Sequence, residues 1–191
     1  MIQANDMSFD FSLILTSIVL GLGVTSLLSN FASWIENVSR VNFYWPQLFW
    51  ALAICVALGQ FWLASWQMQG EFKWTPLPYA IYILYPALLY IISELMFPKL
   101  DSPRIVSLKD HYEANRQWIF GLAAILPLDV FIYECLVYPE QGVINEKNIC
   151  RLGWLVIFVV LSRAKSYYIH VTSSVIVLLS LIVFLIAFQV S

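Results

Sequence analysis

The sequence predicts an all-α protein, a single transmembrane domain over residues 1–191 that folds as a polytopic helix bundle with about six spans. Composition is the first reason, because 61% of the residues are hydrophobic and only 12% are charged, whereas soluble domains carry about 25% charged residues. The mean hydropathy of +0.77 agrees. A soluble core of this size could not bury so much apolar surface, whereas lipid can solvate the outer faces of helices.

The second reason is the length of the apolar runs. A helix needs about 20 apolar residues to cross the hydrocarbon core of a bilayer. The fifth run is short and contains Arg151 and Arg163, so it crosses only if these side chains reach the interface. Otherwise it is re-entrant or interfacial, and five spans remain. The predicted spans are residues 11–35, 45–66, 76–97, 118–138, 149–163 and 167–190.

The longest polar segment is 99–117, between the third and fourth runs. Ser107 is a predicted helix N-cap, with Asp110 three residues later as in a capping box. Lys109 and Glu113 then stand at the i,i+4 spacing of a helical ion pair. We therefore expect a short cytoplasmic juxtamembrane helix that lies at the interface and runs into the fourth span.

Basic residues in short loops predict the orientation, because they accumulate on the cytoplasmic side. With the N-terminus outside, seven basic residues fall inside and three outside, so we expect both termini outside, in the cytoplasmic (inner) membrane of a bacterium. The inner set is Arg40, Lys99, Arg104, Lys109, Arg116, Arg163 and Lys165, and the outer set is Lys73, Lys147 and Arg151. Trp and Tyr residues cluster at the predicted span ends, as in interfacial belts.

Composition also limits the partners. A net charge of −2 gives no electrostatic support for nucleic-acid binding. Two His and three Cys without a CxxC pair predict neither a metal site nor a redox motif, and no cofactor is expected. The expected partner is the lipid bilayer, while a homo-oligomer or another membrane protein is left open.

Asp129 is the most informative polar residue, because it lies near the middle of the fourth span, just after Pro127. A carboxylate at the bilayer centre costs about 2.5–3.5 kcal/mol on insertion scales, so it should face the bundle interior. It either handles protons or cations, or it is a buried aspartate hydrogen-bonded to Gln60, a Tyr or a Ser. Tyr82 and Tyr85 share a face of the third span and either line a polar cavity or pack.

Five further residues complete the set of intramembrane polar candidates. Gln60 is expected to bond to another helix. Glu94 either pairs with Arg163 or reaches the interface alone. Glu134 lies about 140° round the helix from the aspartate, and we expect it to be solvated at the outer interface. His170 begins the last span, where it is either inert or a pH sensor.

Small residues at four-residue spacing mark one face of the first span: Ser17, Gly21, Thr25 and Ser29. Such a ridge allows close helix approach. We expect it to pack within the bundle, against a similar ridge of Ala51, Cys55 and Gly59. The alternative is an oligomer interface or a pore lining.

These observations support two main functions. The first is a small transporter or channel-like protein for protons, ions or a small solute, with Asp129 at the midplane. The second is a non-catalytic membrane subunit, sensor or scaffold that acts through residues 99–117. An intramembrane enzyme has the least support, because no catalytic motif is present.

Overall fold

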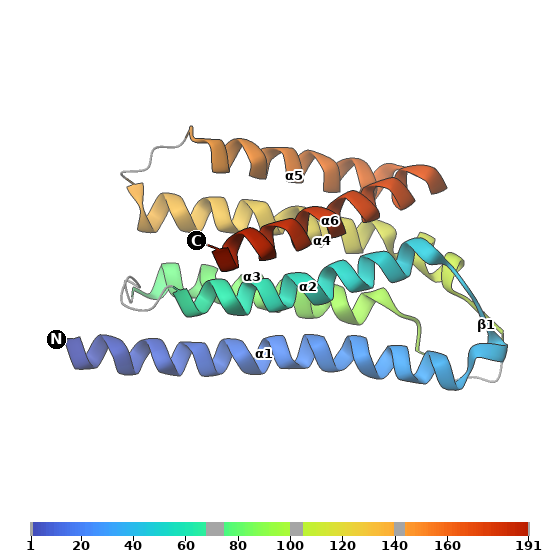
Figure 1. Cartoon of the computed structure of the whole chain (residues 1–191), viewed down its shortest axis with the longest axis horizontal. Coiled ribbons are helices and arrows are strands. Elements are labelled where there is room, and N and C mark those ends of the chain that lie inside the picture. The colour runs from blue at the N-terminus through green and yellow to red at the C-terminus, as the bar shows by residue number, and fades with distance from the viewer. Residues whose placement is uncertain (1, 68–74, 100–104, 140–143, 191) are drawn as a thin grey trace.

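The computed structural model describes residues 2–67, 75–99, 105–139 and 144–190, and it confirms the all-α helix bundle (Figure 1). The helices form where the apolar runs are, because a backbone in lipid must satisfy its own hydrogen bonds. The elements are α1 (Ile2–Glu36), the 3₁₀ turn η1 (Val38–Arg40), β1 (Val41–Asn42), α2 (Trp45–Gln67), α3 (Pro76–Met96), β2 (Val106–Ser107), α4 (Leu108–Val137), α5 (Glu146–Arg163) and α6 (Tyr167–Val190).

Four helices in the described residues are long and apolar enough to cross a membrane, which makes this an integral membrane protein by length and composition. They are α1 from Phe11, α2, α3 and α4. The fifth and sixth helices form where the sequence predicts them. However, α5 contains Glu146, Lys147, Arg151 and Arg163, and the apolar part of α6 described with its side chains ends at Val183. That α5 and α6 cross the membrane therefore stays a prediction.

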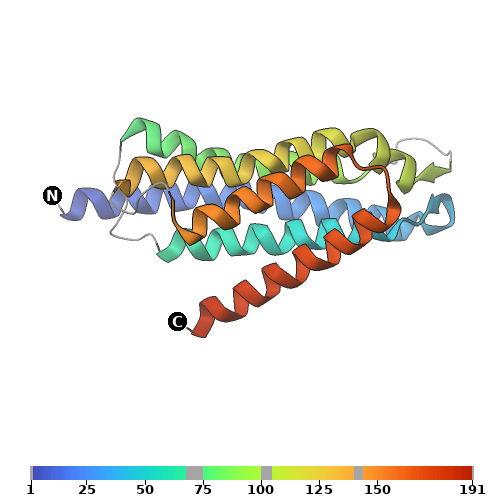
Figure 2. The same ribbon diagram turned by 90° about the horizontal axis from the view of Figure 1, so that it is seen from above.

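The helices run alternately up and down the bundle (Figure 1). α1 packs against α2 and α3, α4 packs against α3 and α5, and α6 packs against α2. The C-terminal part of α6 diverges from the other helices (Figure 2). One end of the bundle gathers the α1–α2, α3–α4 and α5–α6 connections, and we call it the β end because it carries β1 and β2. The predicted inner residues Arg40 and Lys109 lie there, whereas Arg104 and Lys73 lie outside the described residues.

A two-residue parallel ladder closes the β end. Val41 of β1 pairs with Val106 of β2, and Asn42 pairs with Ser107. Next to the ladder, the fully buried Gln47 donates from Nε2 to the carbonyl of Met96 at the end of α3. A terminal helix carbonyl has no partner within its own helix, so Gln47 satisfies a group that burial would otherwise leave unpaired.

The predicted juxtamembrane helix runs into the fourth span as expected, because α4 is continuous from Leu108 to Val137. Its N-cap is the predicted one, since the amide of Asp110 donates to Ser107 Oγ at 3.2 Å. The ion pair between Lys109 and Glu113 also forms, at 3.8 Å. The first turns also belong to the bundle, because Tyr112 is buried among other helices.

The small-residue ridge of α1 packs within the bundle only in part. Ser17 accepts a hydrogen bond from Trp62 Nε1 of α2 at 3.1 Å, but the other ridge residues face outward. Thr25 and Ser29 are exposed, and a Cβ added to Gly21 would meet no atom within 4 Å. The close approach occurs at Gly23 instead, where a Cβ would lie 3.1 Å from Leu58 Cδ2. The helix is apolar on all sides, so the spacing of small residues did not determine its rotation. The second ridge is divided as well, because Ala51 is buried and Cys55 packs against the core, whereas Gly59 is open.

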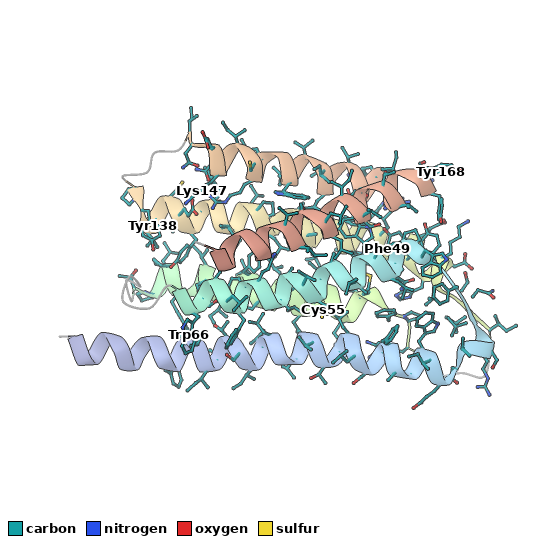
Figure 3. All side chains as sticks on the ribbon, viewed as in Figure 1. Phe49, Cys55, Trp66, Tyr138, Lys147 and Tyr168 are labelled. Carbon is teal, nitrogen blue, oxygen red and sulfur yellow. The ribbon has the colours of Figure 1, made fainter. Side chains whose placement is uncertain are left out.

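Apolar and aromatic side chains cover the outer surface. Large hydrophobic residues such as Ile14, Leu22 and Ile176 are exposed along the helices, as is expected where lipid is the solvent. Tyr168 is exposed at the β end, and Trp66 is exposed at the opposite end, which also carries Tyr138 and Lys147 (Figure 3). Exposed aromatic side chains therefore lie at both ends of the bundle.

Candidate functional site

An apolar cavity of about 230 Å³ lies among α2, α3, α4, α5 and α6. Its walls are almost entirely hydrophobic side chains. Small residues create the space, because Ala53 and Ala57 stand one turn apart on α2 and Ala123 faces them from α4. Larger rings border it, with Trp50 packed edge-on against Phe120 at a centroid distance of 4.9 Å.

The cavity lies where two helix pairs face each other. α5 packs on α4, and α6 packs on α2, so the space between the pairs is bounded by side chains from both. Trp154 and Phe158 of α5 form one wall and Val177 and Leu181 of α6 form another. The side-chain nitrogen and oxygen atoms of the lining belong to Tyr85, to Arg151 and to the indole groups of Trp50 and Trp154.

The polar group at the α5 wall is already paired. Arg151 donates from Nη1 to Glu134 Oε2 at 2.5 Å and from Nη2 to Glu134 Oε1, which is a bidentate ion pair between α5 and α4. Nη1 also donates to the side-chain amide oxygen Oδ1 of Asn148 at 2.5 Å. The two charged side chains are only 17% and 20% exposed. The prediction that Glu134 is solvated alone at the interface was therefore wrong, since its partner sits on the neighbouring helix across the α4–α5 connection.

A second polar group lies at the β end and centres on His170. This residue is 2% exposed, and its Nε2 lies 2.9 Å from the carbonyl of Ala164. A carbonyl only accepts, so Nε2 carries the proton and Nδ1 of the neutral ring accepts. The Tyr112 hydroxyl, 2.8 Å from Nδ1, must then donate to it. His170 is thus a buried link between α4 and the start of α6.

Arg116 lies beside this link, one turn after Tyr112 on α4. It is 6% exposed, and its hydrogen bond within the described residues runs from Nε to the carbonyl of Ser162 at 3.4 Å. Ser162 is the penultimate residue of α5, so Arg116 lies at a helix C-terminus, where a cation is favoured. Arg116 also interacts electrostatically with Tyr44.

Asp129 is buried, at 5% exposure, on the face of α4 that carries Tyr133. Within the described residues no hydrogen bond or ion pair reaches its carboxylate, although Tyr85 lies close enough to interact with it electrostatically. The Tyr85 ring itself stacks on Phe61, with centroids 4.7 Å apart and planes at 10°. The cavity is lined by Leu126, Pro127 and Val130 but not by Asp129. The structure thus places the predicted carboxylate beside the predicted tyrosine and outside the cavity.

The remaining predicted residues are scattered. Gln60 bonds to another helix as expected, donating from Nε2 to the carbonyl of Leu181 on α6 rather than to Asp129. Glu94 and Arg163 are both exposed, and the arginine that pairs with a carboxylate in the described residues is Arg151. The predicted bridge between Glu94 and Arg163 is therefore absent from that part of the chain.

The sequence interpretation missed Gln47, Tyr112 and Arg116, and it treated the last two as parts of a solvated segment. A signal was available for Arg116, because Tyr112, Arg116, Ile119 and Phe120 follow one helix face at spacings of four, three and one. This spacing predicts a helix that buries that face. Gln47 carried no such signal, since its partner is a backbone carbonyl.

No group of three His, Cys, Asp or Glu side chains in the described ranges could hold a metal ion. The arrangement therefore offers an apolar cavity, a neutralised arginine at one side of it and a buried polar link at its β end. No protein-family model matches the chain, and the searches of curated proteins and of solved structures give no match.

Proposed function

We propose that the protein is a non-catalytic membrane protein that binds a hydrocarbon chain, such as the acyl chain of a lipid, in the cavity among α2, α3, α4, α5 and α6. The single observation that carries the proposal is the apolar lining of that cavity. Apolar cavities do not hold water, and one of about 150 Å³ binds benzene. Drug-sized ligands occupy about 300–1,000 Å³, so 230 Å³ suits several methylene groups better than a bulky solute.

The charge distribution around the cavity supports the same choice of ligand. An ion or a polar solute needs unpaired polar groups along its path. Arg151 is already engaged by Glu134, and the Asp129 carboxylate is not part of the lining. A hydrocarbon chain needs neither group.

Binding in the cavity would act on the β end through α4. This helix contributes Ile119, Phe120 and Ala123 to the cavity wall and continues without a break to Leu108. Its first turns belong to the 99–117 segment, of which residues 105–117 are described. A sensor or regulatory subunit could therefore report an occupied cavity to a partner at the predicted cytoplasmic side.

A bulky side chain in the cavity should abolish chain binding. Ala57 lines the cavity, whereas Ala64 lies two turns later on the same helix and is exposed. We expect a diazirine-bearing fatty acid to label cavity residues in wild type and in Ala64→Phe, and to lose that labelling in Ala57→Phe. Peptide mapping by mass spectrometry after illumination measures this. Cavity labelling that survives in Ala57→Phe, or labelling confined to lipid-facing residues such as Ile14, would contradict the proposal.

Proton handling by Asp129 is a second candidate function. One observation favours it, namely that a buried carboxylate has no ion pair in the described residues. Such groups in membranes often belong to proton relays. If this function holds, wild-type protein in proteoliposomes should dissipate a pH gradient, Asp129→Asn should abolish the flux, and the exposed control Asp110→Asn should retain it. A pH-sensitive dye inside the vesicles reports the flux, and unchanged flux in Asp129→Asn would remove Asp129 from consideration.

A further inference from the structure

We propose that Arg116 is the centre of an oxyanion-binding site at the β end, and that the site takes a phosphate group. The site is separate from the hydrocarbon cavity, because Arg116 is not among the cavity residues. The proposal starts from a mismatch between burial and pairing. Arg116 is 6% exposed, and its Nε makes one long bond of 3.4 Å. In the described part of the chain its Nη atoms donate to no protein acceptor and keep some access to solvent, so a ligand can reach them.

The charges around Arg116 do not neutralise it. The C-terminus of α5 supplies about half a negative charge at the Ser162 carbonyl. Glu113 is the acidic residue whose charge reaches the same cluster, but it is exposed and pairs with Lys109 at 3.8 Å. A largely buried cation without a bonded counter-ion is costly, and a bound anion would lower that cost. Arg151 illustrates the contrast, because the same residue type at the other end of α5 has a bidentate carboxylate.

The groups near Arg116 suit an oxyanion. Tyr44 follows β1, and its ring lies 5.3 Å from that of Tyr112 and 5.9 Å from that of Tyr167. Burial, and then the charge of Glu113, raise the pKa of the Tyr44 hydroxyl, so it remains a hydrogen-bond donor. Arg163 follows Ser162 directly but is exposed, so it is a surface charge outside the proposed site.

Geometry favours phosphate as the anion. The guanidinium fork can donate two parallel hydrogen bonds to a phosphate, which a point charge cannot do. The depth agrees, because Trp118 stands two residues after Arg116, Tyr168 is the second residue of α6, and both are exposed. Exposed Trp and Tyr residues mark the headgroup level of a bilayer. The phosphate could belong to a phospholipid headgroup or be free inorganic phosphate.

Lipid binding by the whole protein in detergent tests the site. The probes are phosphatidylglycerol, a diacylglycerol with the same acyl chains, and inorganic phosphate, and native mass spectrometry measures the bound fraction. We expect wild type to bind phosphatidylglycerol about tenfold more tightly than diacylglycerol, as one charge-assisted hydrogen-bonded contact would give. Arg116→Gln should lose this preference, and Arg163→Gln, which removes an exposed charge of the same type, should keep it.

The three probes distinguish a lipid headgroup from free inorganic phosphate as the source of the bound phosphate. Inorganic phosphate that protects the protein against heating, without a preference between the two lipids, would assign the site to a soluble anion. A lipid preference that phosphate competes away would assign it to the headgroup. Equal binding of the two lipids together with no effect of phosphate on wild type would overturn the proposal, and so would equal losses in Arg116→Gln and Arg163→Gln.

Two further comparisons apply if Arg116→Gln fails to fold. The comparison of phosphatidylglycerol with diacylglycerol on wild-type protein needs no variant, and Tyr44→Phe is a milder change at the same site. We expect Tyr44→Phe to weaken the preference for phosphatidylglycerol, and an unchanged preference would remove Tyr44 from the site. Ala57→Phe should leave the preference intact, so the failure of this site can be told apart from the failure of the hydrocarbon cavity.

Discussion

Replacing Arg151 by glutamine is expected to destabilise the protein by about 3 kcal/mol, the lower end of the range for breaking a buried ion pair. The variant would leave the Glu134 carboxylate, 20% exposed, without its bidentate partner. The lower end applies because both side chains keep some exposure. Equilibrium unfolding in mixed micelles of sodium dodecyl sulfate measures the free energy of unfolding.

Two controls accompany this variant. Adding Glu134→Gln to Arg151→Gln removes both charges, so the double variant should be more stable than the single one. Lys109→Gln breaks the exposed pair with Glu113, whose side chains are 59% and 49% exposed, and should cost about 0–1 kcal/mol. Equal losses in Arg151→Gln and Lys109→Gln would show that the Glu134 pair contributes no more than a surface pair.

The second large effect is expected at Phe120, whose truncation to alanine should cost about 3–5 kcal/mol. This ring is 1% exposed and contacts Trp50, Tyr112 and His170. Phe11 is 68% exposed on α1, so Phe11→Ala should change the free energy of unfolding by less than about 0.5 kcal/mol. Thermal unfolding in detergent compares the two variants.

Phe120→Ala should also alter ligand size, because Phe120 lines the cavity. The enlarged cavity should bind benzene or a branched acyl chain that wild type excludes, and the ligand should recover part of the lost stability. Stability losses that match between Phe120→Ala and Phe11→Ala would contradict the packing described for α4.

Helix positions could be predicted from the sequence because lipid imposes a simple length rule on apolar runs. The second run was expected at 45–66 and α2 is Trp45–Gln67; the third was expected at 76–97 and α3 is Pro76–Met96. The N-cap at Ser107 was also predictable, since it depends only on residues within one turn. Local rules therefore located the helices.

Helix rotation could not be predicted in the same way. α1 is apolar around its whole circumference, so no hydrophobic face distinguishes the side of Gly21 from the side of Gly23. The same limit hid the pairing of Glu134, because its contact with Arg151 depends on which faces α4 and α5 turn to each other. In a soluble protein the outer face of each helix carries polar residues, so the sequence pattern shows which side faces the core.

The candidate site was predicted in part for a related reason. Asp129 stood out because a charge in an apolar run is visible from the sequence, and it is indeed buried. Arg116 did not stand out, because it lies in a stretch of polar residues where solvation is the simpler expectation. Only the packing of α4 against α5 removes it from water.

The parallel ladder at the β end has a consequence for the order of assembly. Its two strands are separated in the chain by the whole of α2 and α3, so their hydrogen bonds can form only after that hairpin has been synthesised and inserted. Closing so long a loop is entropically costly, and contacts of this kind form late. During synthesis the β end therefore stays open until α4 begins. The pairing of Val41 with Val106 then joins the α1–α2 connection to the α3–α4 connection.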